Sequence, residues 1–318
     1  MAGLVNAPLP EGLEICGYRI VKKIAVGGFS IVYQACDENG NSVAIKEYLP
    51  SSLARRPEGE HKPYVAAEQM ELYRIGLKYF FDEGRVLASI HHPNIVSVLN
   101  FFRANDTVYM VMAYEQGHTL HDYIEQQRLK KTAATVNERV IRQIFIQIMD
   151  ALREVHAKKL LHLDLKPANI YLRNDGTPIL LDFGAARRTL QADLSQLHPM
   201  YTPGFAAPEL HTKKDLGPWT DIYSLGAAMF NCMTGFAPQA ANERKKQDRM
   251  EHDYRACSGV YSSLLIQLTR WSLMLDPLQR PQSVFNLQNA LRQTSSHKQA
   301  LLSPHNLLSQ LKRWVKQS

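Results

Sequence analysis

One short segment, residues 162–169, brings an acid, a cation and a carboxamide together. It reads His-Leu-Asp-Leu-Lys-Pro-Ala-Asn, with Asp164 and Lys166 two positions apart and Asn169 five positions after Asp164. Phosphoryl transfer needs these groups: a carboxylate to orient a hydroxyl nucleophile, a cation for the charge of the phosphate, and a neutral oxygen ligand for magnesium. A short apolar run farther on leads into Asp182. A second carboxylate at the end of a strand is a good magnesium ligand, so the fold must bring this strand end to the loop.

Strand patterns and helix patterns occupy different parts of the chain. The β-rich runs are residues 18–24, 31–36, 42–48, 95–102 and 107–113, and residues 50–65 are expected to form a loop. Helical spacing predicts a helix through residues 80–90 and a strongly amphipathic one through residues 141–155. The prediction is an α+β fold with a β-rich small lobe containing one main helix, and an α-helical large lobe. The change from strand patterns to helix patterns occurs near Gly117. We therefore expect a lead-in over residues 1–17, lobes over 18–117 and 118–293, and a tail over 294–318.

Composition limits the classes of partner and the location. The net charge is +7 with a pI near 9.1, but no zinc-finger spacing and no basic stripe interleaved with aromatic residues is present, so no nucleic-acid partner is predicted. No apolar run is long enough to span a bilayer, and the N-terminus lacks the basic and apolar regions of an export signal. Four scattered cysteines suit a reducing compartment. The sequence therefore predicts a cytoplasmic protein.

A nucleotide-binding pattern precedes these features. Residues 25–32, Ala-Val-Gly-Gly-Phe-Ser-Ile-Val, predict a tight hairpin whose small residues would let its backbone approach phosphates. A purely structural hairpin explains this run equally well. The next strand ends in Val43-Ala44-Ile45-Lys46, which places a lysine after an apolar run.

Together these segments resemble the Hanks-type protein kinase superfamily over residues 18–293, most closely its bacterial serine/threonine branch. The resemblance implies that Lys46 holds the α- and β-phosphates of ATP and pairs with Glu83. Glu83 is preferred to a solvated carboxylate because it shares a helical face with Phe80 and Leu87. Met112 would lie beside the adenine, whose edge would meet the backbone of Ala113 and Glu115. The implied nucleotide-binding residues, besides Lys46, are Ala25, Gly27, Gly28, Ser30, Val32, Ala44, Met112, Ala113, Glu115 and Tyr171.

The same resemblance assigns the catalytic and substrate residues. Asp164 would accept the proton of the substrate hydroxyl, and Lys166 would steady the γ-phosphate. Asn169 and Asp182 would bind Mg²⁺, with Mn²⁺ as an alternative ion. Thr202 would contact both Asp164 and Lys166, as in enzymes that act on serine and threonine.

Two structural contacts are also implied. Glu209 would pair with Arg280, because a buried carboxylate needs a cationic partner. Asp221 would accept hydrogen bonds from the backbone of the catalytic loop, although a helix N-terminal carboxylate explains its position as well.

The sequence departs from the family pattern in three places. Leu163 replaces the arginine that usually grips a phosphorylated activation loop, so activity is expected not to depend on that phosphorylation, with Arg187 or Arg188 as alternative grips. Ala25 and Ser30 replace the outer glycines, which predicts weakened nucleotide binding. The segment between Lys46 and Glu83 is longer than in most protein kinases.

The tail, residues 294–318, carries basic residues and an apolar helical face. Packing on its own lobe is the preferred interpretation, and docking to a partner or an anionic membrane surface is the alternative.

The predicted activity is ATP-dependent phosphorylation of serine and threonine in protein substrates, with autophosphorylation. One alternative is a pseudokinase that serves as an ATP-binding scaffold, which usually lacks one of the key lysine or aspartate residues. The other is a small-molecule kinase, whose relatives generally lack the segment from Thr202 to Glu209.

Overall fold

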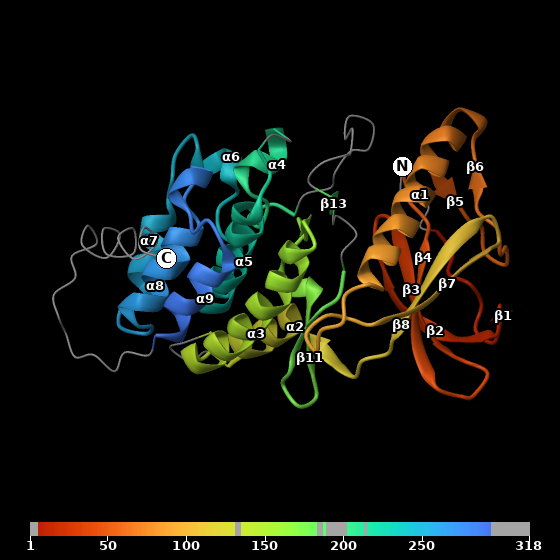
Figure 1. Cartoon of the computed structure of the whole chain (residues 1–318), viewed down its shortest axis with the longest axis horizontal. Helices are drawn as coiled ribbons and strands as arrows, with labels where there is room; N and C mark the ends of the chain where they lie inside the picture. Colours follow the sequence, from red (N-terminus) through yellow and green to blue (C-terminus); the bar gives the residue numbers. More distant parts are fainter. Residues whose placement is uncertain (1–5, 131–134, 183–186, 189–201, 213–214, 294–318) are drawn as a thin grey trace. The chain divides into compact units, whose positions relative to one another are not determined.

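The structure, a computed structural model, describes residues 6–130, 135–182, 187–188, 202–212 and 215–293. It divides into two compact units, one of described residues 6–116 and one of described residues from Gly117 onward. The elements of the first unit, which Figure 1 draws from red to yellow, are β1 (Glu14–Ile15), β2 (Tyr18–Val26), β3 (Ser30–Cys36), β4 (Ser42–Tyr48), β5 (Ala54–Arg55), β6 (Tyr64–Val65), η1 (Ala67–Gln69), α1 (Met70–Leu87), β7 (Val98–Ala104) and β8 (Thr107–Ala113).

The main sheet of the first unit is antiparallel and strongly curled. Its strand order is β1-β2-β3-β4-β8-β7. Three strands separate β2 from β7, yet Tyr18 of β2 stacks on Phe102 of β7 with ring centroids 5.6 Å apart. Asn100 Nδ2 of β7 also donates to the Tyr18 hydroxyl at 3.1 Å. Rings from separated strands meet only on the inside of a curl, so this face is concave.

Helix α1 packs closely on the opposite face of the sheet (Figure 1). Its inward positions Phe80 and Leu87 are buried, as their helical spacing predicts. A Cβ atom at Gly76 would lie 1.8 Å from the Tyr48 hydroxyl, and one at Gly84 would lie 1.9 Å from the Phe101 ring. The two glycines therefore allow a separation between helix and sheet that larger residues would prevent.

Three predictions for this unit need correction, two of element boundaries and one of a loop. Helix α1 ends at Leu87, because the chain turns there with the Ile90 N–H donating to the Leu87 carbonyl. Strand β7 begins at Val98, because a turn at Pro93 and Asn94 precedes it, closed by the Ile95 N–H donating to the His92 carbonyl at 3.1 Å. Residues 50–65 do not form a simple loop, since β5 and β6 pair as a short antiparallel hairpin.

The second unit is mainly helical. Its elements are β9 (Gly117–Thr119), α2 (Leu120–Leu129), α3 (Glu138–Ala157), β10 (Leu160–Leu161), η2 (Pro167–Asn169), β11 (Ile170–Arg173), β12 (Pro178–Leu180), β13 (Arg187–Arg188), α4 (Pro208–Thr212), α5 (Pro218–Thr234), α6 (Ala241–Arg244), α7 (Met250–Cys257), α8 (Ser263–Ser272), η3 (Pro277–Gln279) and α9 (Val284–Arg292).

Helices α3 and α5 form the core of this unit. The apolar face predicted for α3 is confirmed, because Ile141, Ile148 and Val155 are all fully buried. Helix α5 is apolar on nearly every side and buried along most of its length, as expected of a central helix. It begins at Pro218 and ends at Thr234, and the following Gly235 has a φ of 79°, the left-handed conformation that glycine favours after a helix.

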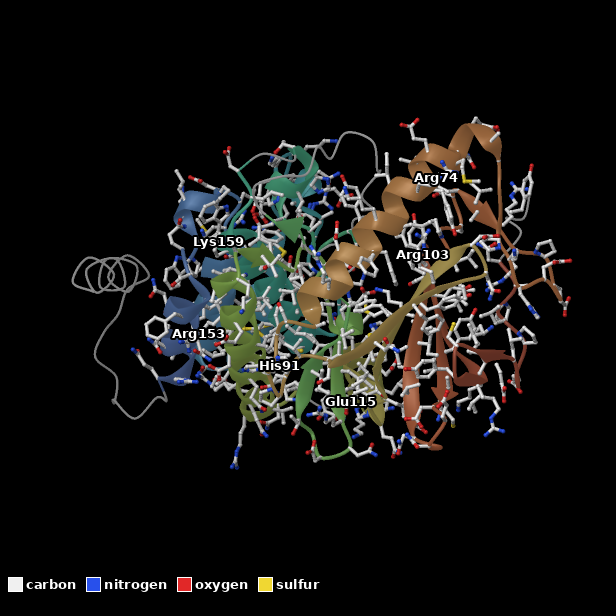
Figure 2. All side chains as sticks on the ribbon, turned by 45° about the vertical axis from the view of Figure 1, so that its right-hand side comes forward. Arg74, His91, Arg103, Glu115, Arg153 and Lys159 are labelled. Atoms are coloured by element: carbon white, nitrogen blue, oxygen red, sulfur yellow. The ribbon has the colours of Figure 1, made fainter. Side chains whose placement is uncertain are left out.

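The predicted α+β fold, with strands in the first part and helices in the second, is confirmed. In the part of the chain that the structure describes, no helix has the length and apolar character needed to cross a bilayer. Exposed basic side chains come from separate elements: Arg74 from α1, Arg103 from β7 and Arg153 from α3 (Figure 2). The tail lies outside the described residues, so its role stays a prediction.

Candidate active site

The loop before Asp164 is held by one buried carboxylate. Asp221, in the first turn of α5, accepts from the backbone N–H groups of His162 at 2.9 Å and Leu163 at 2.8 Å. It also accepts from His156 Nε2 of α3 at 2.7 Å. Burial alone would raise the pKa of Asp221, but the hydrogen bond from His156, the positive charge of the two neighbouring histidines and the Leu163 N–H lower it below its ordinary value. The predicted contact between Asp221 and the loop backbone is confirmed.

Leu163 adopts an unusual backbone conformation within this loop. Its φ is 63°, in the left-handed region that costs a residue with a Cβ atom about 1–2 kcal/mol. The hydrogen bond from its N–H to Asp221 offsets part of that strain. Its side chain is buried, so an apolar residue suits the position.

The functional side chains of the loop form a hydrogen-bonded cluster. Lys166 Nζ donates to both carboxylate oxygens of Asp164, at 2.9 and 3.1 Å, and to the hydroxyl of Thr202 at 3.0 Å. Asn169 Nδ2 donates to Asp164 Oδ2 at 2.9 Å and to its backbone carbonyl at 2.8 Å. The Asp164 side chain stays 27% exposed, so a substrate hydroxyl can still reach it. The Thr202–Lys166 contact is confirmed, and the link from Thr202 to Asp164 runs through Lys166.

A hairpin brings the second carboxylate to the same loop. Strands β11 and β12 pair with Ile170 opposite Leu180. Beyond this pair, the Leu181 N–H donates to the Asn169 carbonyl at 3.1 Å, so Asp182 is only one residue away from that bond. Carboxylate and amide oxygens are hard ligands that suit Mg²⁺. Because Asn169 directs its Nδ2 to Asp164, its amide oxygen is turned away from that carboxylate. The amide oxygen of Asn169 and the carboxylate of Asp182 are thus ligand types that fit a magnesium ion.

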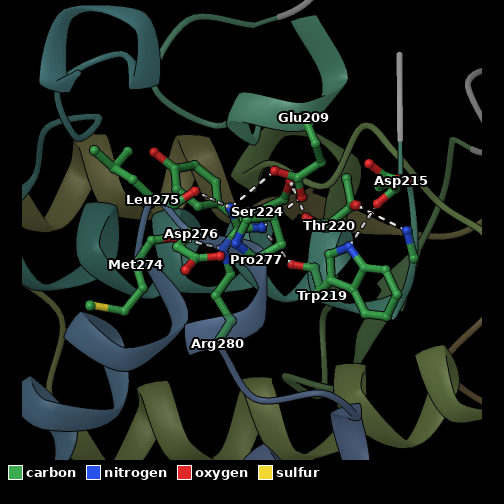
Figure 3. Close-up of polar contacts among 12 residues, drawn as sticks. Glu209, Asp215, Trp219, Thr220, Ser224, Met274, Leu275, Asp276, Pro277 and Arg280 are labelled. Carbon is green, nitrogen blue, oxygen red and sulfur yellow. Dashed lines mark hydrogen bonds and ion pairs between the residues drawn. The ribbon is translucent and has the colours of Figure 1, made fainter. Parts of the chain in front are cut away.

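The segment after Thr202 is anchored by a buried ion pair (Figure 3). Arg280 donates to both carboxylate oxygens of Glu209, at 2.7 and 3.0 Å, as the sequence predicted. Arg280 also donates to the carbonyls of Met274, Leu275 and Trp219. Ser224 Oγ of α5 donates to the Phe205 carbonyl at 2.8 Å. These contacts fix the backbone after Thr202, at Phe205 and at Glu209.

Several predicted nucleotide-binding residues share one face of the sheet in the first unit. Lys46 lies opposite Val32 of β3, and Ala44 lies opposite Met112 of β8. Ala25 of β2 lies opposite Val32. Because side chains two positions apart in a strand point to the same face, these five residues lie together. Figure 1 shows the strands that carry them.

Lys46 points to the α1 side of the sheet. Its side chain is 7% exposed, and its Nζ lies 5.7 Å from the centroid of the Phe80 ring in α1. Glu83 lies one helical turn after Phe80 on the same helix. The side chain of Glu83 is outside what the structure describes, so its pairing with Lys46 stays a prediction.

The tip of the predicted phosphate-binding hairpin is attached to the chain after β4. The Gly27 N–H donates to the Ser30 carbonyl at 2.8 Å, which closes the β2–β3 turn. The Gly28 carbonyl accepts from the Ser51 N–H at 2.9 Å and from Ser51 Oγ at 3.2 Å. The hairpin is therefore held at its tip as well as along its strands.

The remaining predicted residues are divided between the two units. Ala113 ends β8, and Glu115 follows it, partly exposed (Figure 2). Tyr171 lies in β11 of the second unit, opposite Thr119 of β9 and Ile179 of β12. The first unit thus carries Ala113 and Glu115, and the second unit carries Tyr171.

Comparison with known proteins agrees with this fold. The features define an α+β protein with a kinase-type catalytic loop. Residues 18–294 match the protein kinase domain family, and the chain belongs to that family.

Similar proteins include serine/threonine kinases of bacteria. The probable serine/threonine-protein kinase PknB of Lactococcus lactis is 30% identical over 224 residues, which cover 70% of this chain and 32% of PknB. Serine/threonine-protein kinase PknA of Nostoc is 28% identical over 234 residues, which cover 70% of this chain and 38% of PknA. The chain thus spans about a third of the length of these relatives.

The solved structure described as the PpkA-294 apo form is also similar. It has a TM-score of 0.77 and 33% sequence identity, with 90% of this chain and 99% of that chain covered. The kinase fold predicted from the sequence is therefore confirmed.

One charged group beside the predicted site was missed by the sequence interpretation. Glu47, next to Lys46, and Arg56, in the segment expected to be a loop, form a fully buried ion pair. An acidic residue inside the apolar strand Val43–Tyr48 was the available signal, because buried carboxylates require partners.

Proposed function

We propose that the chain transfers the γ-phosphate of ATP to serine and threonine hydroxyls of protein substrates and of itself. The observation that carries the proposal is the hydrogen-bonded cluster of Asp164, Lys166, Asn169 and Thr202. It combines a partly exposed carboxylate, a cation and a hydroxyl-bearing residue in one place. Membership of the protein kinase family supports the same reaction.

In the proposed reaction the acceptor hydroxyl lies beside Asp164. Its oxygen bonds to the γ-phosphorus, the bond from that phosphorus to the bridging oxygen of ADP breaks, and the hydroxyl proton passes to the Asp164 carboxylate. Lys166, fixed by Asp164 and Thr202, stabilises the negative charge on the transferring group. Mg²⁺ or Mn²⁺ at Asn169 and Asp182 would neutralise phosphate charge when bound.

Two other functions are less well supported. A scaffold without catalysis usually lacks one of the key residues, whereas Lys46, Asp164, Asn169 and Asp182 are all present. A small-molecule kinase is disfavoured by the anchored segment between Thr202 and Glu209, which suits an extended protein substrate. A cytoplasmic location belongs to the same proposal, because all four cysteines are free thiols.

The direct test uses ATP radiolabelled at the γ-phosphate, a generic basic acceptor protein, and the Lys46→Met variant. Wild type is expected to label the acceptor and itself, with the label on serine and threonine after acid hydrolysis. Lys46→Met removes the cation proposed to hold the phosphates, so labelling should fall by a factor of about 100 or more. Equal labelling by both proteins would contradict the role of Lys46, and label on tyrosine alone would contradict the acceptor class.

Regulation without loop phosphorylation is a second expectation of the proposed function. Leu163 cannot grip a phosphate, and its backbone is held by Asp221 instead. Protein treated with a general phosphatase should therefore keep its initial rate of acceptor phosphorylation. Mass spectrometry would establish that Thr189 and Ser195 are unmodified, and a mock-treated sample is the control. Loss of turnover after dephosphorylation would show that another residue, such as Arg187 or Arg188, performs the grip.

A further inference from the structure

Glu47 follows Lys46 in β4 and points to the opposite face of the sheet. Successive side chains of a strand alternate between faces. Lys46 lies on the α1 side, 5.7 Å from the Phe80 ring centroid. Glu47 lies on the concave side, where it is 0% exposed. A rotation of β4 about its axis that moves one of these two side chains therefore also moves the other.

The Glu47 carboxylate is held by charged and polar donors. Arg56 forms a parallel pair of hydrogen bonds with it, Nη1 to Oε1 at 2.5 Å and Nη2 to Oε2 at 2.8 Å. The hydroxyl of Tyr33 donates to Oε2 at 2.7 Å, and that of Tyr109 donates to Oε1 at 2.9 Å. Burial alone would lower the pKa of Arg56, but its hydrogen bonds and the charge of Glu47 raise it. The carboxylate is therefore fixed in both position and orientation.

Arg56 belongs to the long segment between Lys46 and Glu83, and it also fastens the start of the described chain. Its Nε donates to the Ala7 carbonyl at 2.9 Å, and its backbone N–H donates to Asn6 Oδ1 at 2.7 Å. The Ala7 N–H returns a bond to the Arg56 carbonyl at 3.0 Å. Residues from both segments thus close the concave side of the curled sheet behind β4.

The same long segment contacts the second phosphate-binding element. Ser51 donates to the Gly28 carbonyl at the tip of the β2–β3 hairpin, through its N–H at 2.9 Å and its hydroxyl at 3.2 Å. One segment is therefore bonded both to the strand that carries Lys46 and to the hairpin that carries Gly27 and Gly28.

Stability alone is a weak explanation for a charged pair in this position. Replacing a buried ion pair by apolar side chains of similar volume is often neutral or stabilising. What an apolar pair lacks is direction, because only paired hydrogen bonds hold a side chain at a defined angle. The direction imposed on Glu47 is transmitted to Lys46 through the backbone of β4.

We propose that Arg56 and Glu47 are positioning residues that orient Lys46 towards the phosphates of ATP, and that the segment of residues 51–65 serves this task through its contacts. The proposal rests on the proposed function of Lys46. It assigns a role to a part of the chain that contains none of the predicted ATP-binding or catalytic residues.

The test compares wild type with a double variant that carries both Glu47→Gln and Arg56→Met. This variant removes both buried charges and leaves an amide whose oxygen can accept from one tyrosine hydroxyl while its NH₂ group donates to the other. We expect a melting temperature close to that of wild type and a kcat/KM for ATP about 10- to 100-fold lower, the range for a misplaced catalytic group. The KM for the acceptor protein should not change. Arg56→Met alone should lower the melting temperature and raise the KM for ATP.

Ile15→Ala is the matched control for lost stability. Ile15 is buried in β1, and two strands, β2 and β3, separate β1 from β4. This variant should melt earlier and keep the wild-type KM for ATP, because partial unfolding removes active enzyme without changing the affinity of the rest. If Ile15→Ala raises the KM for ATP as much as Arg56→Met does, the effect is one of stability and the proposal is wrong.

The other outcomes also support or overturn the positioning proposal. A folded double variant with wild-type kcat/KM for ATP would overturn the proposal even when Lys46→Met is inactive. Full activity of Lys46→Met would instead overturn the proposed function of Lys46, and this inference with it. If the double variant does not fold, Arg56→Lys replaces it, because lysine keeps the charge but loses the parallel pair of bonds. A lower kcat/KM for ATP then supports positioning, and an unchanged value contradicts it.

Discussion

Asp164→Asn is expected to lower kcat by about 10²- to 10⁴-fold, the contribution typical of a positioned acid–base group. Asparagine has nearly the same shape as aspartate, so the hydrogen bonds from Lys166 and Asn169 can in part persist. It carries no negative charge, however, and cannot take the proton of the acceptor hydroxyl. The KM for ATP should change little, because Asp164 is assigned to the acceptor. Initial rates at varied ATP concentration measure both constants.

Asp175→Asn provides the control for this variant. Asp175 lies in the exposed turn between β11 and β12 of the same unit, where it accepts from the Thr177 N–H at 2.8 Å. It receives the same chemical change without any contact to the cluster, and its kcat should equal that of wild type. Near-normal turnover by Asp164→Asn would exclude Asp164 as the proton acceptor and return the scaffold interpretation to consideration.

Arg280→Met is expected to destabilise the protein by about 3–5 kcal/mol, the range for breaking a buried ion pair by removing one partner. The side chains of Arg280 and Glu209 are 0% and 6% exposed, so the Glu209 carboxylate would stay buried without a counter-charge. Three backbone carbonyls would lose a donor as well. Thermal unfolding followed by circular dichroism should show a fall of roughly 6–20 °C in Tm.

A second arginine in the same unit offers a close comparison. Arg270 also forms two hydrogen bonds with one carboxylate, that of Glu251, at 2.6 and 3.1 Å. These side chains are 40% and 54% exposed, so water can solvate the carboxylate that remains. Arg270→Met should therefore cost no more than about 1 kcal/mol. Equal losses of stability in the two variants would contradict burial as the cause.

The sequence predicted best where residues are close along the chain or belong to a dense motif. Asp164, Lys166 and Asn169 span a few positions, so a single loop suffices to bring them together. The pairing of Glu209 with Arg280, 71 positions apart, was predicted from family resemblance, since no local rule connects two residues so distant. The apolar spacing of α3 was sufficient because helical periodicity alone determines which face is buried.

The sequence predicted least where a polar residue acquires its partner only after the sheet has curled. Glu47 could have been an exposed residue of an edge strand. It is buried because Tyr18 and Phe102 draw β2 and β7 together and close the concave face around it. Residues 50–65 looked irregular because proline and glycine break every periodic pattern there, yet Arg56 from this segment supplies the counter-charge.

The sequence by itself determined the family, the α+β division of the chain and the chemical groups of the catalytic loop. These depend on local spacing and on residue type, which the covalent chain fixes directly. Only the tertiary structure decided how those groups are held. The left-handed backbone at Leu163 is held by Asp221 from α5, and the strand of Lys46 is held by Arg56 from a separate segment. Such contacts join residues that are distant in sequence, and burial makes them strong by removing the water that would otherwise compete for each charge.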